Sequence, residues 1–282
     1  METWIQLVLL SGLILGFYNI FKKKALEINS VVEVLIAYTT LSFIILIPQF
    51  SNALQTDYKY IIIIFLKSMI VFVSWLISFT ALKNMPISTY SVFYLSRILF
   101  VAIWGIVILG ERIIPIHLLG MGIIIFGLLM VNLNQKVKKE PYERKYIWYV
   151  LLSCFIISFS SVIDKVVMPH INTGQMQFWF MGFLTLLYIL YITITKTKLN
   201  FNIMKKNYWL PILAVSVLLA SRFHFMANAL PESDISLIVF LRTFSVIITL
   251  LVGGLWFKEK QLLYKLFCSL IVLFGIALIV LY

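Results

Sequence analysis

Long apolar runs constrain the fold of this 282-residue chain more than any other feature. They recur along its whole length and are separated by short polar or proline-containing breaks. A helix that crosses a bilayer needs about 20 predominantly apolar residues, because the hydrocarbon core is about 30 Å thick. Only 12% of the residues are charged and 62% are hydrophobic, against about 25% and 45–50% in soluble domains. The sequence therefore predicts an all-α membrane protein.

The positions of these runs predict ten transmembrane helices. The first run lacks a basic segment before it and a small-residue cleavage site after it, so it is interpreted as a spanning helix and not as a signal peptide. Several connections are only about four residues long, which favours antiparallel neighbours. The expected spans are residues 4–21, 31–50, 60–82, 87–108, 113–132, 147–164, 175–195, 208–230, 235–256 and 261–281.

The chain also contains an internal duplication. A shift of 148 residues aligns Glu111 with Glu259, and a shift of 142 aligns Lys23 with Lys165. Because each half holds five helices, the second half must enter the membrane from the opposite side. Such inverted repeats are typical of transporters with a substrate site near the bilayer midplane. The predicted organisation is a first five-helix repeat, a charged connector and a second five-helix repeat, at residues 1–133, 134–145 and 146–282.

Two related motifs stand at the end of the fourth helix of each repeat. Leu109-Gly110-Glu111-Arg112 is followed by Gly120 and Gly127, and Phe257-Lys258-Glu259-Lys260 by Gly275 at the same spacing. Through these motifs the chain resembles the EamA family of the drug/metabolite transporter superfamily over essentially its whole length. The resemblance implies ten helices in two repeats and the transport, mostly export, of amino acids, metabolites, nucleotide sugars or drugs.

The motif glutamates, Glu111 and Glu259, also have a structural interpretation. A carboxylate just before a helix accepts hydrogen bonds from the free N–H groups of the first turn and favours the positive end of the helix dipole. Both glutamates are therefore expected to cap the following helix. Cys268 stands where the first repeat has Gly120. It and Cys154 lie in apolar runs and are interpreted as packing residues, not as a disulfide or a metal site.

The distribution of basic residues predicts the orientation. Fifteen Lys and Arg residues lie in the connectors after odd-numbered helices, and three lie on the other side. By the positive-inside rule the odd-numbered connectors are cytoplasmic and both termini are outside, in a bacterial cytoplasmic (inner) membrane. The family resemblance implies cytoplasmic termini instead, which conflicts with the charge count; we keep the charge-based prediction of external termini. The net charge of +12 is assigned to membrane anchoring and not to nucleic acid.

Four cations lie deep in apolar runs: Lys67, Arg97, Arg222 and Arg242. Each costs roughly 2.5–3.5 kcal/mol at a helix centre, so such residues usually face a cavity or a partner. We expect them to line a central cavity and to bind a carboxylate or phosphate, which matches the planar guanidinium fork. The alternative is that each side chain snorkels to the interface or pairs with a backbone carbonyl.

Aromatic and titratable residues extend this candidate site. Tyr90 and Tyr94 are four residues apart on one helix face, and Trp75 lies about two turns before the end of its helix, so these three are expected to line the cavity. His224 and Glu33 are the candidates for a proton relay. Many other aromatic residues must face lipid, and a lone His is more often a packing residue.

What the sequence lacks excludes several functions. It contains no P-loop, no metal-spaced His/Cys/Asp/Glu cluster and no nucleophile motif, so no cofactor, metal or enzymatic activity is expected. The favoured function is secondary-active export of an anionic or zwitterionic metabolite such as an amino acid, by alternating access and with proton coupling as one option. The rivals are a nucleotide-sugar or phosphorylated-carrier-lipid translocator and a non-transporting membrane scaffold. A monomer and a homodimer are both compatible with the sequence.

Overall fold

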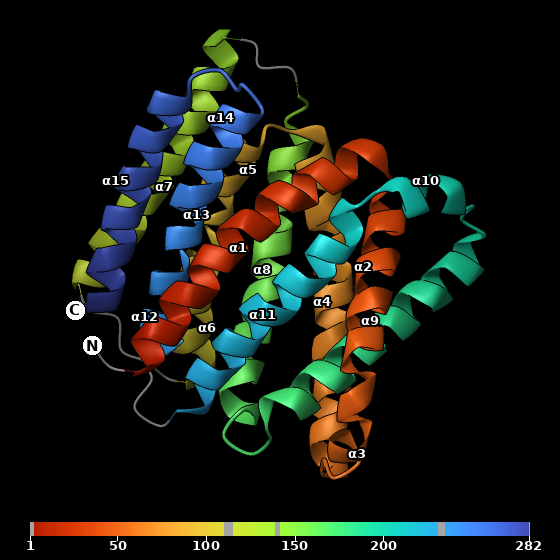
Figure 1. The fold of residues 1–282 in the computed structure, drawn as a ribbon. Coiled ribbons are helices and arrows are strands. Elements are labelled where there is room, and N and C mark those ends of the chain that lie inside the picture. Colours follow the sequence, from red (N-terminus) through yellow and green to blue (C-terminus); the bar gives the residue numbers. More distant parts are fainter. Residues whose placement is uncertain (1–2, 110–114, 139–141, 231–234, 282) are drawn as a thin grey trace.

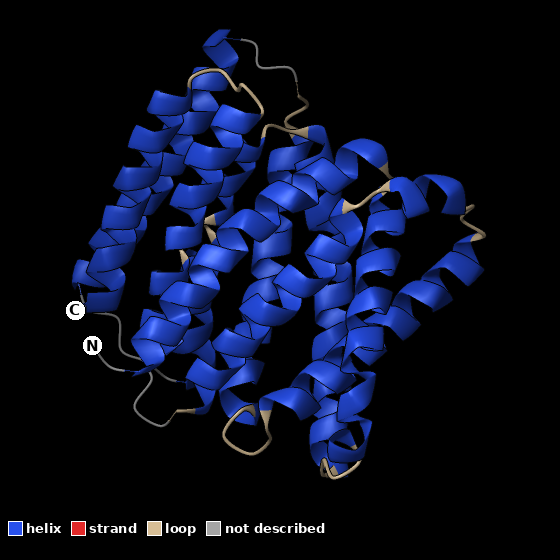
Figure 2. Ribbon diagram, in the orientation of Figure 1, coloured by secondary structure: helices blue, strands red, loops and turns tan. Residues whose placement is uncertain are grey.

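The computed structural model describes residues 3–109, 115–138, 142–230 and 235–281, and within these ranges the chain is helical apart from short connections (Figures 1 and 2). The first half of the chain forms α1 (Thr3–Ile28), α2 (Val31–Leu46), η1 (Ile47–Gln49), α3 (Phe50–Ala53), α4 (Tyr58–Asn84), α5 (Ile87–Tyr94), α6 (Arg97–Leu109) and α7 (Pro115–Lys138). The second half forms α8 (Lys145–Val167), α9 (Thr173–Thr195), α10 (Phe201–Lys206), α11 (Trp209–Ala229), α12 (Ile235–Arg242), α13 (Phe244–Ile248), the π-helical turn η2 (Thr249–Gly253), α14 (Gly254–Trp256) and α15 (Leu262–Leu281).

Eight helical segments in the described part of the chain are long and apolar enough to cross a membrane. The protein is therefore a multi-pass membrane protein. Two further apolar segments, Ile87–Val101 and Phe240–Trp256, are shorter. The first includes the break between α5 and α6, and the second the break between α12 and α13. Length and composition alone therefore do not give the expected count of ten transmembrane helices.

Several helices extend beyond their expected ends. The first helix was expected to stop at residue 21, but α1 continues to Ile28 because Ala25 and Leu26 are fully buried in the bundle. Likewise α8 continues from the expected residue 164 to Val167. Asp164 therefore lies within a helix, about one turn from its end, and not in a connector.

The two interrupted helices break at equivalent positions. α5 ends at Tyr94 and α12 ends at Arg242, and the shift of 148 residues aligns the two helices from their first to their last residue. Figure 1 shows that α5 with α6, and α12 with α13 and α14, each run from one end of the bundle to the other. The same figure places the start of α1 and the end of α15 at the same end of the bundle.

The glycines of the sequence motifs bring α7 and α15 close together. A Cβ added to Gly120 would lie 2.6 Å from the carbonyl oxygen of Gly275, and a Cβ added to Gly275 would lie 2.7 Å from that of Gly120. A Cβ added to Gly127 would clash with Val272 and approach Cys268. Small residues at helix crossings are how membrane helices gain close packing. Glycine pairs of this kind explain the motif's spacing without any role in transport.

Glu259 caps a helix, but not the one expected. Its carboxylate accepts hydrogen bonds from the backbone N–H groups of Ile87 and Ser88 at 2.5 and 3.0 Å, and from the Ser88 hydroxyl. These groups belong to the first turn of α5 in the other repeat, whereas the sequence favoured the following helix, α15. The correction has a simple cause: η2 of the second repeat packs against α5 of the first, so the turn after α14 brings Glu259 to the start of α5. Glu111 lies outside the described residues.

Lys23 contacts the connection between α4 and α5 at its α4 end. Its ammonium group donates to the carbonyl oxygens of Leu82 and Met85 at 2.6 and 2.9 Å. These carbonyls end α4, where a positive charge is favoured by the helix dipole. The expected cytoplasmic anchor is therefore a helix cap. Lys23 and Glu259 together fix where α4 stops and α5 starts.

We predict that Glu259→Gln lowers the free energy of unfolding by about 1–2 kcal/mol, as loss of a charged helix cap does. Thermal unfolding of the purified protein in detergent measures the change. Glu27→Gln is the matched control, because the ion pair that Glu27 forms with Lys24 lies at the surface, where the Glu27 side chain is 45% exposed. Equal effects of the two substitutions would contradict the capping role.

Candidate functional site

A cavity of about 130 Å³, here called the central cavity, lies between α1, α4, α5, α6, α8, α9, α11 and α12. Both repeats contribute to its wall. Four cationic side chains line it, together with a single carboxylate, that of Asp164. The cations are Lys22, Lys67, Arg97 and Arg242.

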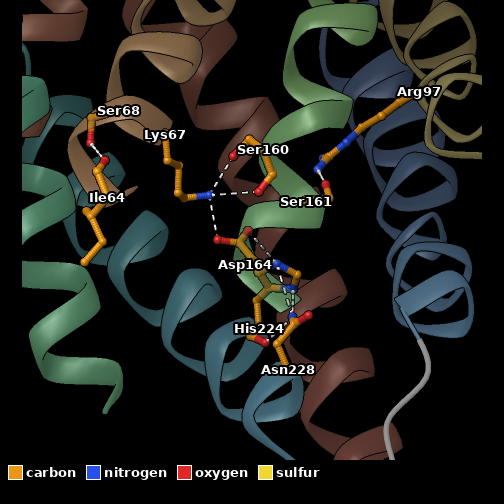
Figure 3. A network of polar contacts seen from close by, with 9 residues as sticks. All are labelled: Ile64, Lys67, Ser68, Arg97, Ser160, Ser161, Asp164, His224 and Asn228. Atoms are coloured by element: carbon orange, nitrogen blue, oxygen red, sulfur yellow. Dashed lines mark hydrogen bonds and ion pairs between the residues drawn. The ribbon is translucent and has the colours of Figure 1, made fainter. Parts of the chain in front are cut away.

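Lys67 of α4 and Asp164 of α8 form a buried ion pair (Figure 3). The Lys67 ammonium lies 2.6 Å from Asp164 Oδ1, and the two side chains are only 4% and 6% exposed. The same ammonium donates to the hydroxyl of Ser160, one turn earlier on α8, at 2.6 Å. Lys67 therefore bonds to two groups on one helix face, which fixes α4 against α8 at the level of the cavity.

His224 of α11 completes this network on the other side of the carboxylate. Its Nε2 lies 3.5 Å from Asp164 Oδ2. Asn228, one turn further along α11, donates to the backbone carbonyl of His224 at 2.8 Å and lies 3.2 Å from its Nδ1 (Figure 3). Asp164 thus stands between the Lys67 ammonium on α4 and the His224 imidazole on α11.

Arg97 begins α6, directly after the break in the fourth helix of the first repeat. Its Nη2 donates to the Ser161 hydroxyl at 2.5 Å (Figure 3). Its Nε is buried and has no hydrogen-bond partner among the described residues. The guanidinium is thus only partly satisfied by the protein, and it is partly exposed to the cavity that it lines.

Arg242 is the last residue of α12 and occupies the corresponding break in the second repeat. Its Nε is likewise buried without a partner in the described part of the chain. A recess of about 40 Å³ joins the central cavity here and is lined by Tyr94, Arg97, Arg242 and Ser245, among others. The 148-residue shift aligns Tyr94 with Arg242 and Arg97 with Ser245. Both aligned pairs, Tyr94 with Arg242 and Arg97 with Ser245, therefore line the same recess.

Lys22 is held differently from the other three cations. Its ammonium lies 5.3 Å from the ring centre of Tyr18, 4.8 Å from that of Phe79 and 5.4 Å from that of Tyr90. Such contacts stabilise a cation by about 0.5–2 kcal/mol each, more when water is excluded. The side chain is 5% exposed and also lines the cavity. We refer to these three rings as the Lys22 cage.

The aromatic residues expected at the site lie there. Trp75, Tyr90 and Tyr94 all line the central cavity. Tyr90 and Tyr94 stack with ring centres 5.6 Å apart, and the Tyr90 hydroxyl bonds to Ser78 at 2.6 Å. These rings add an aromatic part to the lining of the cavity, beside the ion-pair network of Lys67, Asp164 and His224.

Two expected site residues lie elsewhere. Arg222 is exposed and does not line the cavity, because it is two residues from His224 and the helix turns it to another face. Glu33 caps its own helix: its carboxylate accepts hydrogen bonds from the backbone N–H groups of Ser30 and Asn200 at 2.9 and 2.7 Å. Neither residue belongs to the site that the structure defines, so the sequence-based assignments of Arg222 and Glu33 are corrected.

Sequence reasoning overlooked Asp164 and Lys22. Asp164 was placed at a helix end, and Lys22 was counted among the surface anchors, because both helices were expected to be shorter than they are. A signal was present, since the 142-residue shift that aligns Lys23 with Lys165 also aligns Lys22 with Asp164. The two repeats place opposite charges at the same position of their first helix.

The central cavity has the chemistry of an anion site. Three of its cations have no carboxylate partner among the described residues, because Asp164 is engaged by Lys67 and His224. Positive charge inside a membrane protein that lacks a protein counter-ion is stabilised when a negative ligand enters. In the same described part of the chain, no three His, Cys, Asp or Glu side chains are grouped as metal ligands would be.

Comparison with known proteins supports the fold assignment. The sequence matches the EamA-like transporter family over residues 2–133 and 144–281. A comparison with curated proteins gives no match. One solved structure, titled only as the crystal structure of a protein, is 15% identical, covers 96% of each chain and superimposes with a TM-score of 0.61. At that identity the likeness concerns the fold alone.

We predict that Lys67→Met and Asp164→Asn each lower the free energy of unfolding by about 3–5 kcal/mol, because each leaves a buried partner without compensation. The double variant should recover most of this loss, since it removes both members of the pair. Chemical unfolding of the wild type, the two single variants and the double variant in detergent micelles measures these changes in the free energy of unfolding. Lys145→Met serves as control, because the Lys145–Glu143 pair is exposed and an exposed ion pair contributes little to stability. Additive losses in the double variant would show that the two side chains are not coupled.

Proposed function

The chain belongs to the EamA-like transporter family, and we propose that it is a secondary-active transporter of an anionic or zwitterionic metabolite, such as an amino acid, which it exports across a bacterial cytoplasmic membrane. A transporter in this sense is not an enzyme: it binds a solute and releases it unchanged on the other side. The proposal rests on one observation, the charge of the central cavity.

That charge favours anions over cations. Lys22, Lys67, Arg97 and Arg242 face the cavity, against the single carboxylate of Asp164. The free guanidinium edges of the two arginines line one recess, where a carboxylate or phosphate can accept two hydrogen bonds from each fork. A cationic drug or quaternary amine in this recess would be repelled by both arginines.

A zwitterion also fits the arrangement. Asp164 is not among the residues that line the arginine recess, and beyond its contacts with Lys67 and His224 its carboxylate keeps acceptor positions for a substrate ammonium. An amino acid could therefore place its carboxylate at Arg97 and Arg242 and its ammonium toward Asp164. The volume of about 130 Å³ is below the 300–1,000 Å³ typical of sites for drug-sized ligands. It favours a small metabolite over a nucleotide sugar or a carrier lipid.

Alternating access follows from the proposed inverted repeats, at residues 1–133 and 146–282 on either side of the connector. We count α5 with α6, and α12 with α13 and α14, as two interrupted spans in addition to the eight uninterrupted ones, which gives ten. Interrupted helices at the midplane are typical of substrate sites in inverted-repeat transporters. Rocking of the two repeats would expose Arg97 and Arg242 to each side in turn. His224 is the residue we propose for proton coupling.

For the orientation we retain the charge-based proposal. Lys22 is buried and Lys23 caps α4, so neither anchors the surface. The remaining asymmetry is still thirteen basic residues against three. This supports cytoplasmic odd-numbered connectors and external termini.

We predict that Arg97→Ala and Arg242→Ala each reduce the flux of a carried anion or zwitterion to about a tenth or less, because a charge-assisted hydrogen bond is worth about 1.5–3 kcal/mol. Flux into liposomes that contain the purified protein, screened with amino acids, other carboxylates and phosphorylated metabolites, measures this. Arg222→Ala is the matched control, since it removes the same charge from an exposed position. Unchanged flux in both cavity variants, or flux of cationic amines instead, would contradict the proposal.

We predict that a cysteine at Glu143, which is 66% exposed, is protected from a membrane-impermeant maleimide in intact cells and labelled after lysis. A cysteine at Tyr58, which is 75% exposed near the start of α4, should react in intact cells. Cys154 and Cys268 are buried and free, so background labelling should be low. The reverse pattern would place the termini in the cytoplasm.

A further inference from the structure

A second hollow, larger than the central cavity, opens on the outer surface of the bundle. Its volume is about 350 Å³, and it lies between the α5–α6 break, α7 and α8. We call it the lateral hollow. It reaches the surface beside Ile125, Leu129 and Trp148, which are 50%, 50% and 71% exposed. Because these residues belong to membrane-spanning helices, the hollow faces lipid and not water over most of its length.

The walls of the lateral hollow are apolar. They include Phe93, Leu99, Phe100, Leu128 and Leu151. α7 packs along α15, and its residues Ile125, Leu128 and Leu129 line the hollow. An empty space of this size in hydrocarbon forfeits dispersion contacts on all its walls, and its volume is in the range of small-molecule sites. The available filler at this depth of a bilayer is an acyl chain.

One end of the hollow is polar and basic. Arg144 immediately precedes α8, and Asn132 lies near the end of α7, so both stand at the end where the two helices are connected. Arg144 is exposed and has no ion-pair partner within the described ranges, whereas the neighbouring Lys145 is paired with Glu143 at 2.6 Å. The Asn132 amide oxygen is buried without a hydrogen-bond partner in the same ranges. Trp148, one turn beyond Arg144, is the type of residue that lies at the headgroup level.

We propose that the lateral hollow binds an anionic phospholipid, with one acyl chain between α7 and α8 and the phosphate at Arg144. Basic pockets between transmembrane helices are a recurring mode of headgroup recognition. The apolar walls favour an acyl chain. The guanidinium of Arg144, which has no ion-pair partner within the described ranges, favours a negatively charged headgroup. This binding site is separate from the central cavity and does not depend on what the cavity carries.

The bound lipid would contact the α5–α6 break on the side opposite the central cavity. Ser96 lines the lateral hollow, and the next residue, Arg97, lines the central cavity. An acyl chain in the hollow therefore supports the α5–α6 break on the face opposite the substrate. Loss of the lipid would remove packing contacts from that face of the break.

Native mass spectrometry of the detergent-purified protein tests the proposal, with phosphatidylglycerol, phosphatidylcholine and soluble glycerol 3-phosphate as probes. Phosphatidylglycerol should bind to the wild-type protein at least tenfold more tightly than the other two. Arg144→Gln should weaken that binding about tenfold, and Leu129→Trp should do the same by filling the hollow from its exposed rim.

Two matched variants serve as controls. Lys145→Gln removes the neighbouring charge, and Leu118→Trp adds the same ring on α7 about 16 Å from Leu129, at ~1.5 Å per residue; both should bind phosphatidylglycerol as the wild type does. Equal losses in Arg144→Gln and Lys145→Gln would reduce the effect to general surface charge and overturn the proposal. Equally tight binding of phosphatidylcholine would overturn it as well, because the site would then not recognise the negative headgroup. Equally tight binding of glycerol 3-phosphate would overturn it because the acyl chain would then not contribute to binding. Because Leu129 and Arg144 are exposed, neither substitution should prevent folding.

Discussion

Lys67 and Asp164 are buried together at the level of the central cavity, and their ion pair sets the conditions for the rest of the site. A lone charge at this depth is costly, and a pair repays that cost only with good geometry and further hydrogen bonds. Ser160 and His224 supply those contacts. Since Asp164 is thereby occupied, it is not free to neutralise the arginines. The cavity carries excess positive charge because four cations face one carboxylate, and the pairing with Lys67 decides that the two arginines are among those without a carboxylate partner in the described residues.

The helix breaks beside the cavity follow from a second constraint. Backbone groups without helical partners are tolerated within a membrane only where protein or a cavity surrounds them. Both breaks, after Tyr94 and after Arg242, meet at the same recess. The duplication of the break in both repeats makes the recess a shared product of the two halves.

The repeats are symmetric in scaffold and asymmetric in chemistry. Gly120 and Gly275 pack against each other as equivalent helices do, and equivalent helices break at equivalent residues. Lys22 and Asp164, in contrast, occupy the same repeat position with opposite charge. Lys22 is surrounded by aromatic rings, while Asp164 is held in a polar network. A symmetric scaffold permits the two halves to move alike, and the asymmetric charges give the cavity a polar end and an aromatic end.

The sequence alone determined the helical membrane class, the duplication and seven of the residues that line the cavity, because apolar length, a constant shift and charges in apolar runs can all be read from the sequence. It indicated Lys67, Arg97, Arg242, His224, Trp75, Tyr90 and Tyr94, all of which line the central cavity. Only the tertiary structure decided that Asp164 and Lys22 belong there too, since the ends of α1 and α8 depend on what each helix packs against. It also decided that Glu259 caps α5 and that Arg222 faces outward. Partners far apart in sequence, and the rotation of a helix about its axis, are fixed by packing between helices, which one segment's composition does not encode.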